Sequence, residues 1–277
     1  MAERRAPTTG PLLDTLEATL RRAHQHVLSI RYPEGFWWGE LESNATMEAE
    51  YLLLTHFLGV ADPQRWRKIA NYLLSRQRED GSWGQYYGAP GDLSTSVECY
   101  FALKLAGVPP DTPALRRARE FILSRGGVPR TRIFTKLWLA LFGQWDWRGL
   151  PAMPPETVLL PTWSPVNIYE FASWARATMV PLFIVLSLKP TCPIPPWAAV
   201  DELYPVPRGQ VRYTLPPPSS LLGWAGFFSL LDKALHWYDR FPIGPLRRKA
   251  VRACVDWIVA HQEADGSWGG IQPPWVY

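Results

Sequence analysis

Apolar residues recur every three or four positions along most of the chain, which is the spacing that gives an α-helix one apolar face. No stretch shows the apolar–polar alternation of a half-buried strand. The pattern therefore predicts an all-α fold of paired helices packed as a barrel or toroid. The expected helices span residues 12–29, 45–58, 63–76, 94–106, 113–125, 131–142, 165–188, 220–238 and 245–261.

Several expected helices have a clear start signal. A capping residue precedes a proline at 62–63, 112–113, 164–165 and 244–245. Proline suits the first helical position because the amide hydrogen that it lacks would have no partner there. Thr95-x-x-Glu98 has the spacing of a capping box and predicts one further start.

Two segments carry almost the same eight residues. Residues 77–84 read Gln-Arg-Glu-Asp-Gly-Ser-Trp-Gly, and residues 262–269 read Gln-Glu-Ala-Asp-Gly-Ser-Trp-Gly. Asp-Gly favours a turn because glycine adopts positive φ without a Cβ clash. The glutamine can bond a neighbouring helix end, and the tryptophan can cover that contact. We interpret the pair as a structural repeat rather than a catalytic site. Its defining residues are Gln77, Gly81, Trp83, Gln262, Gly266 and Trp268.

Weaker copies of this unit occur at 34–39, without a clear glutamine, and at 117–126, where Gly126 stands in the glutamine position. Trp37 and Trp83 are 46 positions apart, which is the length of one helix pair with its turns. After residue 269 only eight residues remain. The helix that Gln262 and Trp268 would hold is missing, so we expect a truncated product, one half of a split protein, or a fragment.

Composition narrows the class of protein. An apolar content of 47% in 277 residues is typical of a globular chain with a sizeable core. The net charge of +4 is too small to indicate nucleic-acid binding. Three scattered cysteines give no disulfide or metal spacing and favour a reducing compartment. We expect no metal, no cofactor, no signal peptide and no membrane-spanning helix.

Residues 190–218 differ from the rest because they contain nine of the 28 prolines. A loop of this length inside a compact domain is either functional or a surface excursion, and both interpretations remain open.

The repeat and several longer stretches resemble the bacterial squalene–hopene cyclases, whose hallmark is the Gln-Trp repeat. The stretches that carry the resemblance are residues 35–39, 44–51, 93–98, 132–138, 167–177 and 269–275. The resemblance implies an α/α barrel that is one of two domains in the complete enzyme. It further implies that residues 1–35 pack on the missing domain, that 36–269 form the barrel, and that 270–277 begin the next segment.

That family cyclises squalene to hopene in a cavity between its domains, and it sits on one face of the membrane without spanning it. The resemblance thus implies squalene, the cytoplasmic membrane surface and a C-terminal catalytic half as partners. The family's catalytic acid lies in an Asp-x-Asp-Asp motif, which this sequence lacks. We therefore expect the chain to supply cavity wall and to be inactive alone. The alternatives are a binding or scaffold toroid, or another terpene cyclase or prenyltransferase on this fold.

Site residues carry over one at a time. Glu48, Glu98 and Arg132 resemble the family's polar network, although a salt-bridged helix interior would look the same. The resemblance also implies a cavity lined by Phe134, Trp138, Trp174, Ile271, Gln272 and Pro273. Aromatic faces in such a cavity can stabilise a carbocation, but aromatics at helical spacing are also ordinary core residues.

Membrane contact is expected from the apolar residues 219–231, followed by the basic residues 247–249. The apolar stretch 179–188 is expected to add to the same surface. Burial of both helices in the barrel or against the missing half is the competing interpretation.

Overall fold

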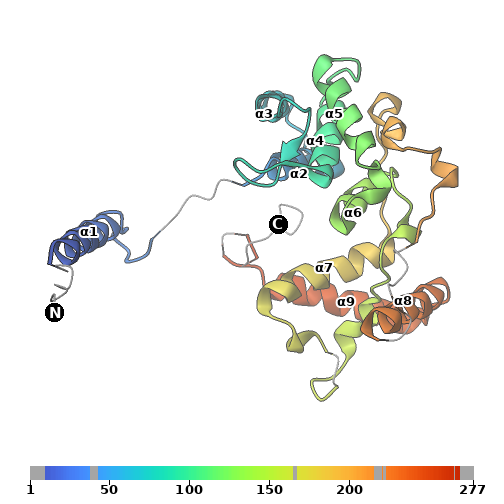
Figure 1. Cartoon of the computed structure of the whole chain (residues 1–277). Coiled ribbons are helices and arrows are strands. Elements are labelled where there is room, and N and C mark those ends of the chain that lie inside the picture. Colours follow the sequence, from blue (N-terminus) through green and yellow to red (C-terminus); the bar gives the residue numbers. More distant parts are fainter. Residues whose placement is uncertain are drawn as a thin grey trace, which may run out of the picture. The chain divides into compact units, whose positions relative to one another are not determined.

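The computed structural model describes residues 10–37, 43–164, 167–214, 220, 223–264 and 266–268 (Figure 1). The chain divides into two compact units, Met1–Glu42 and Ser43–Tyr277. This division falls at residue 42 rather than at 35. The expected final segment, 270–277, lies outside the described residues, as do the candidates Ile271, Gln272 and Pro273. The described residues are predominantly helical, which confirms the all-α class.

The smaller unit holds α1 (Gly10–Ser29) and the turn that follows it. The larger unit holds two short strands, β1 (Trp83–Gly84) and β2 (Gly91–Asp92), which pair antiparallel. Its α-helices are α2 (Thr46–Phe57), α3 (Pro63–Ser75), α4 (Leu93–Leu105), α5 (Pro113–Ser124), α6 (Ile133–Leu141), α7 (Ser173–Leu188), α8 (Trp224–Arg240) and α9 (Gly244–Ala260). Short 3-10 helices lie at η1 (Val128–Arg130), η2 (Trp147–Gly149), η3 (Pro155–Leu159), η4 (Ile168–Glu170), η5 (Pro196–Ala198), η6 (Asp201–Leu203) and η7 (Arg208–Gln210).

Helix starts follow the local capping chemistry where the sequence signal is strong. The Asp62 carboxylate accepts the backbone N–H of Gln64 at the start of α3, and the Thr112 hydroxyl accepts that of Leu115 at the start of α5. The capping box at Thr95 was wrong. Asp92 caps α4 instead, so the helix begins earlier and Glu98 lies inside the protein rather than at a helix end.

The expected helix 165–188 begins later than predicted, because α7 starts at Ser173. Asn167 accepts the backbone N–H of Tyr169 and donates to the Ser164 carbonyl oxygen. These bonds stabilise a turn and the short helix η4 in place of a continuous α-helix.

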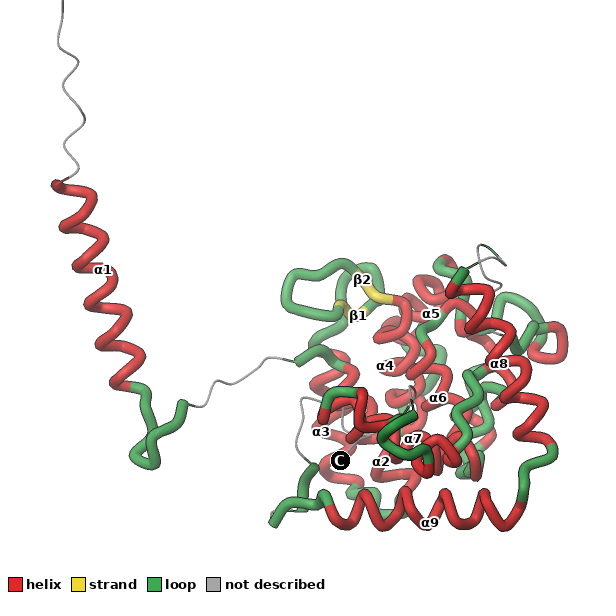
Figure 2. Tube along the Cα trace, turned by 90° about the horizontal axis from the view of Figure 1, so that it is seen from below, coloured by secondary structure: helices red, strands yellow, loops and turns green. Residues whose placement is uncertain are grey.

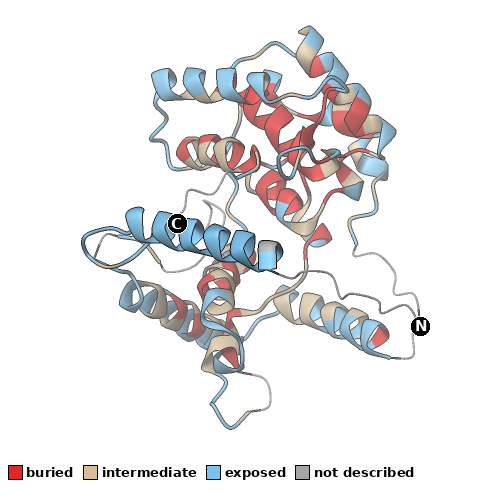
Figure 3. Ribbon diagram, turned by 60° about the vertical axis from the view of Figure 1, so that its left-hand side comes forward, coloured by how far each residue is buried: buried red, intermediate tan, exposed pale blue. Residues whose placement is uncertain are grey.

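Helix α4 forms the centre of the main core, since every residue from Ser94 to Leu105 is buried. It packs against α2 and α5 and also contacts α3 and α6. Figure 3 shows the buried residues gathered on the larger unit, whereas the helix of the smaller unit is exposed along its length. A second, smaller core lies around Val180 and Phe183 of α7 and Cys254 of α9.

The proline-rich segment is packed rather than a free surface excursion. Ala198, Val200 and Leu203 are fully buried in the main core. The side chain of Gln144 accepts the backbone N–H of Val200, and the Tyr204 hydroxyl donates to the Gln144 carbonyl oxygen. Within this segment η5 packs against α4 and η6 packs against α5, so the segment closes the core.

The turns that follow α1, α3 and α9 share one set of hydrogen bonds, and the turn after α3 leads into β1 (Figure 2). In each, the tryptophan indole donates to the backbone oxygen ten residues earlier: Trp37 to Val27, Trp83 to Leu73 and Trp268 to Ile258. The turn glycines Gly35, Gly81 and Gly266 all have positive φ.

The two complete copies also agree in their glutamines. Gln77 donates to the Gly81 carbonyl oxygen at 2.9 Å, and Gln262 donates to that of Gly266 at 3.0 Å. Gln77 additionally donates to the Ala114 carbonyl oxygen in the first turn of α5. A Cβ at Gly81 would lie 2.5 Å from the Arg117 backbone. The turn therefore packs directly against α5 at a position where only glycine fits.

Candidate functional site

A buried polar cluster links α4 to the start of α6. The Glu98 carboxylate is almost completely buried and accepts the hydroxyl hydrogen of Thr135. Arg132 is the N-cap residue of α6, and its guanidinium group lies 3.6 Å from the Glu98 carboxylate. Burial raises the pKa of Glu98, and the charge of Arg132 opposes that rise. Two of the three residues expected in the polar network thus lie together.

The second carboxylate of this cluster is Glu50 rather than Glu48. Burial raises the pKa of Glu50 to about 9, and the charge of the neighbouring Glu98 adds to the rise. A carboxyl group with such a pKa is neutral at pH 7 and can donate a hydrogen bond. Glu48 lies two residues before Glu50 on α2, where burial also raises its pKa and the charge of Arg76 opposes the rise.

Three carboxylate oxygens in this region are buried without a hydrogen-bond partner among the described residues: Oε2 of Glu48, of Glu50 and of Glu98. An unpaired buried acceptor costs free energy. The cluster therefore has capacity for polar groups that the described residues do not supply.

The three described aromatic candidates lie in different environments. Trp138 of α6 is buried, and its side chain favours the charged form of Glu50. Phe134, one turn earlier on α6, is 39% exposed. Trp174 lies in the first turn of α7 and is 58% exposed. Only Trp138 is thus tied directly to the carboxylate cluster among these described candidates.

The family model described as the squalene-hopene cyclase N-terminal domain matches residues 20–277. The chain belongs to this family. The resemblance drawn from the sequence motifs is thereby confirmed, and the cyclase domain accounts for nearly all of the chain.

Named relatives show the same relationship at the level of sequence. The squalene–hopene cyclase of Alicyclobacillus acidocaldarius is 48% identical over 261 residues, which cover 94% of this chain and 40% of that protein. The squalene–hopene cyclase of Zymomonas mobilis is 41% identical over 95% of this chain and 40% of its own length. The dammaradiene synthase of Dryopteris crassirhizoma is 39% identical over 95% of this chain and 38% of its own length. The cyclase domain therefore spans about two fifths of these relatives.

Helix α8 of the cyclase domain exposes large apolar side chains, while three of its polar residues, Asp232, Tyr238 and Asp239, bind the rest of the protein. Asp232 accepts the backbone N–H of Ala152, and Tyr238 donates to Glu156. Asp239 pairs with Lys189. The exposed apolar residues are Trp224, Phe227, Phe228, Leu230, Leu231 and Trp237. No helix in the described part of the chain is sufficiently long and apolar to cross a bilayer.

Two expectations about the membrane surface were wrong. Within 179–188, Val180, Leu182 and Phe183 are buried, because α7 packs against α9 and the main core. Arg247 is also unavailable to headgroups, since it pairs with Glu156 at 2.7 Å and with Asp239 at 2.9 Å. Arg248 and Lys249 are exposed.

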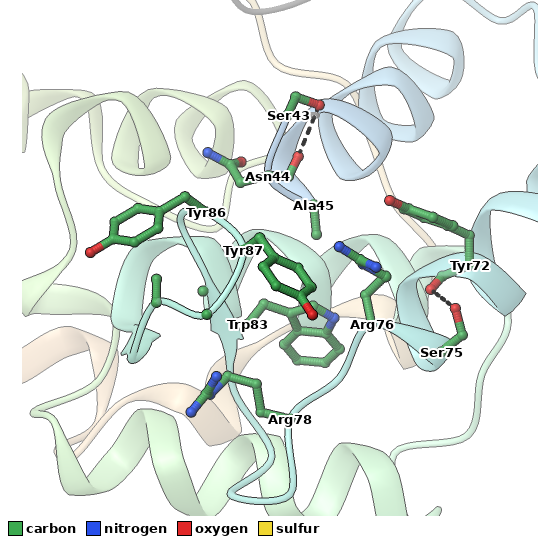
Figure 4. A pocket seen from close by; sticks show the side chains of 13 residues that line it. Ser43, Asn44, Ala45, Tyr72, Ser75, Arg76, Arg78, Trp83, Tyr86 and Tyr87 are labelled. Atoms are coloured by element: carbon green, nitrogen blue, oxygen red, sulfur yellow. Dashed lines mark hydrogen bonds between the residues drawn. The ribbon is translucent and has the colours of Figure 1, made fainter. Parts of the chain in front are cut away.

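A separate surface pocket of about 230 Å³ lies beside the turn at residues 77–84. Figure 4 shows Arg76 and Tyr87 next to Trp83 in this pocket. None of the carboxylates of the buried cluster lines it. We assign no role to this pocket.

Sequence reasoning missed Glu50 although it lies in the same Met-Glu-Ala-Glu run as Glu48. Both glutamates precede apolar residues on one helix, and two positions correspond to a rotation of about 200°. The apolar pattern does not separate them, because Leu52 lies one turn after Glu48 and Leu53 one turn after Glu50, and both leucines are fully buried. Residues at i, i+3 and i+4 share a helix face, so by this pattern either glutamate could point inward.

Proposed function

We propose that this chain is the N-terminal portion of a triterpene cyclase that converts squalene to hopene, and that it supplies one wall of the reaction cavity. The observation that carries the proposal is the buried cluster of Glu50, Glu98 and Arg132 beside Trp138, in a chain that belongs to this family. The cluster places neutral and charged hydrogen-bonding groups next to an aromatic face.

The reaction itself adds a proton to one terminal alkene, closes rings through carbocations and returns a proton. The atoms of squalene and hopene therefore balance. Protonating an isolated alkene requires a strongly acidic carboxyl group. We assign that acid to a C-terminal catalytic half that carries Asp-x-Asp-Asp. In this chain Glu98, Arg132 and Glu50 would orient the polar end of the cavity, and Phe134, Trp138 and Trp174 would offer π faces to the cations.

We further propose that helix pairs of this chain form an α/α toroid joined by the Gln-Trp turns. The common hydrogen bonds of the three turns support this arrangement. The turn at Trp37 would belong with α1 to the domain that the C-terminal half completes. Apolar residues of α1, including Leu13, Leu16 and Leu20, recur at helical spacing and are exposed, so they would pack on that half.

In the proposed assembly α8 docks on the cytoplasmic surface of the membrane and does not span it. Its support is a helix that is held to the protein through Asp232 and Tyr238 and whose aromatic and leucine side chains are exposed. Replacing Trp224, Phe227 and Leu230 together by serine should abolish flotation of the chain with liposomes. Replacing exposed Tyr86 and Tyr87 by serine is the matched control. Equal flotation of both variants would remove α8 from the proposal.

Cyclase activity gives the decisive test. The purified chain should form no hopene from squalene, and co-expression with a C-terminal half bearing Asp-x-Asp-Asp should restore conversion, measured by gas chromatography and mass spectrometry. A polyene folded against half a cavity would meet water, which quenches cations. Hopene formed by the chain alone would move the acid to Glu50 or Glu98. Squalene binding without conversion in the reconstituted pair would favour a scaffold.

In the active pair, Trp174→Leu and Gln272→Ala should change the product mixture with little change in folding. Trp163→Leu, which replaces another exposed tryptophan of the larger unit, is the control. Unchanged products would return Trp174 and Gln272 to a structural role.

A further inference from the structure

Helix α8 borders a groove that the cyclisation proposal does not use. On one side of the helix lies a hollow of about 790 Å³. It is lined by Trp147 and Arg148 of η2 and by Tyr213 and other residues of the proline-rich segment. A second hollow of about 280 Å³ continues along α8. The two share the lining residues Arg148, Thr214, His236 and Arg240. We call these four residues, together with Lys233 and Trp237, the α8 groove.

The charges of the groove follow from helical spacing. Lys233, His236 and Arg240 lie three, four and seven positions apart, so they form one stripe along α8. Arg148 faces this stripe from the 3-10 helix η2. Among the described residues, Lys233 and Arg240 form no ion pair. The groove thus presents two unpaired cations and a third cation, Arg148, which is held by Asp146 at 2.6 Å.

The carboxylates near the groove are already occupied. Asp239 lines the larger hollow and pairs there with Lys189, which also lines it, and with Arg247. Asp232 accepts the backbone N–H of Ala152 and lies 3.6 Å from His236. Asp239 is therefore neutralised by its two cations, and Lys233 and Arg240 outnumber the one remaining carboxylate of the groove, Asp232.

An apolar stripe runs directly beside the cationic one. Trp237 lines the groove and is 68% exposed, and Leu230, about two helical turns before it, is 69% exposed. Tryptophan prefers the boundary between headgroups and acyl chains because its ring is apolar and its N–H is polar. A soluble anion would gain nothing from this stripe, whereas a lipid would use both stripes at once.

We propose that the α8 groove binds the phosphate of an anionic phospholipid, with its acyl chains lying along Trp237 and Leu230. Lys233, Arg240 and Arg148 hold the phosphate by charge-assisted hydrogen bonds. The inference rests on the proposed membrane docking of α8 and adds to it a headgroup preference. One bound lipid would hold α8 at the bilayer surface, with Trp237 and Leu230 toward the acyl chains and the phosphate at Lys233 and Arg240.

The test uses the intact chain and vesicles of phosphatidylcholine with or without phosphatidylglycerol, compared by sedimentation. Each cation at an anionic surface contributes about 1 kcal/mol, so Lys233→Gln with Arg240→Gln should lower binding to the anionic vesicles about thirty-fold. Binding to phosphatidylcholine alone should change less than about two-fold, because the apolar contacts remain. The control is Arg248→Gln with Lys249→Gln, which removes the same charge from exposed positions on α9.

The outcomes separate the groove from docking in general. Equal losses in the groove and α9 variants would show diffuse attraction and overturn the site. Loss of binding to both vesicle types in the Trp224, Phe227 and Leu230 serine variant, together with equal losses in the two charge variants, would keep membrane docking without the groove. Displacement of the chain by inorganic phosphate at constant ionic strength, with equal effect on the groove variant, would also contradict a lipid site. Circular dichroism of each variant confirms that α8 is retained.

Discussion

Replacing Glu202 by leucine is expected to lower the free energy of unfolding of the larger unit by about 3 kcal/mol, because it leaves a buried ammonium group unpaired. Lys104 lies in the last turn of α4, and its Nζ is 2.6 Å from the Glu202 carboxylate. The lysine side chain is only 5% exposed. After the substitution its remaining partner is the Ala199 carbonyl oxygen. Tyr100 also loses the acceptor for its hydroxyl.

The melting temperature should fall by about 6–12 °C for a unit of this size. Lys104→Met combined with Glu202→Leu should recover most of the loss, because a buried ion pair costs nearly as much to desolvate as it returns. Asp201→Asn is the matched control. It breaks an exposed pair with Arg208 in the same segment and should cost less than about 1 kcal/mol. A double variant as unstable as Glu202→Leu alone would contradict a penalty from the unpaired charge.

This ion pair also marks the limit of sequence-based prediction for the fold. The sequence predicts α3 and α5 well, because Asp62 and Thr112 are local caps whose partners lie two or three residues away. Lys104 and Glu202 are 98 positions apart, and neither lies in a pattern that points to the other. The packing of the proline-rich segment therefore could not be predicted, because the hydrogen bonds that hold it to α4 and to Gln144 join residues more than 50 positions apart.

The candidate site shows the same division. Glu98 and Arg132 were predicted from motifs and lie together. Choosing Glu50 over Glu48 depends on which face of α2 meets α4, and that is a tertiary contact. The sequence places Arg247 in a basic run that was expected at the surface. In the structure it forms ion pairs with Glu156 of η3 and Asp239 of α8 and is largely buried. Residue types were predictable at these positions, whereas their partners were not.

The stability of the chain is expected to fall as the pH rises from about 5 to 9, and Glu50 should be a main cause. Burial, followed by the Glu98 charge, raises the pKa of Glu50 from 4.5 to about 9. Above the lower value the unfolded chain loses this proton while the folded chain keeps it. The folded state then binds more protons, so stability present at low pH is lost as pH rises toward the folded pKa.

The slope gives the size of the effect. One retained proton reduces the free energy of unfolding by about 1.4 kcal/mol for each pH unit between the two pKa values. Glu98 acts in the same direction, because burial raises its pKa as well. Urea unfolding at a series of pH values measures the combined slope of the free energy of unfolding against pH. Glu50→Gln removes the contribution of one titrating group from that slope.

Glu50→Gln should therefore flatten the dependence on pH, because glutamine keeps the hydrogen-bonding shape of the neutral carboxyl group without titrating. Glu120→Gln, on the exposed surface of α5, is the control for loss of one carboxylate. Parallel slopes for the wild type and Glu50→Gln would mean that Glu50 is ionised in the folded chain. In that case Arg132 would have to balance two buried carboxylates, and Glu50 could not donate a proton to Glu98 at the polar end of the proposed cavity. A flattened slope would instead establish a neutral carboxyl group beside Glu98 at pH 7, as the proposed cavity requires.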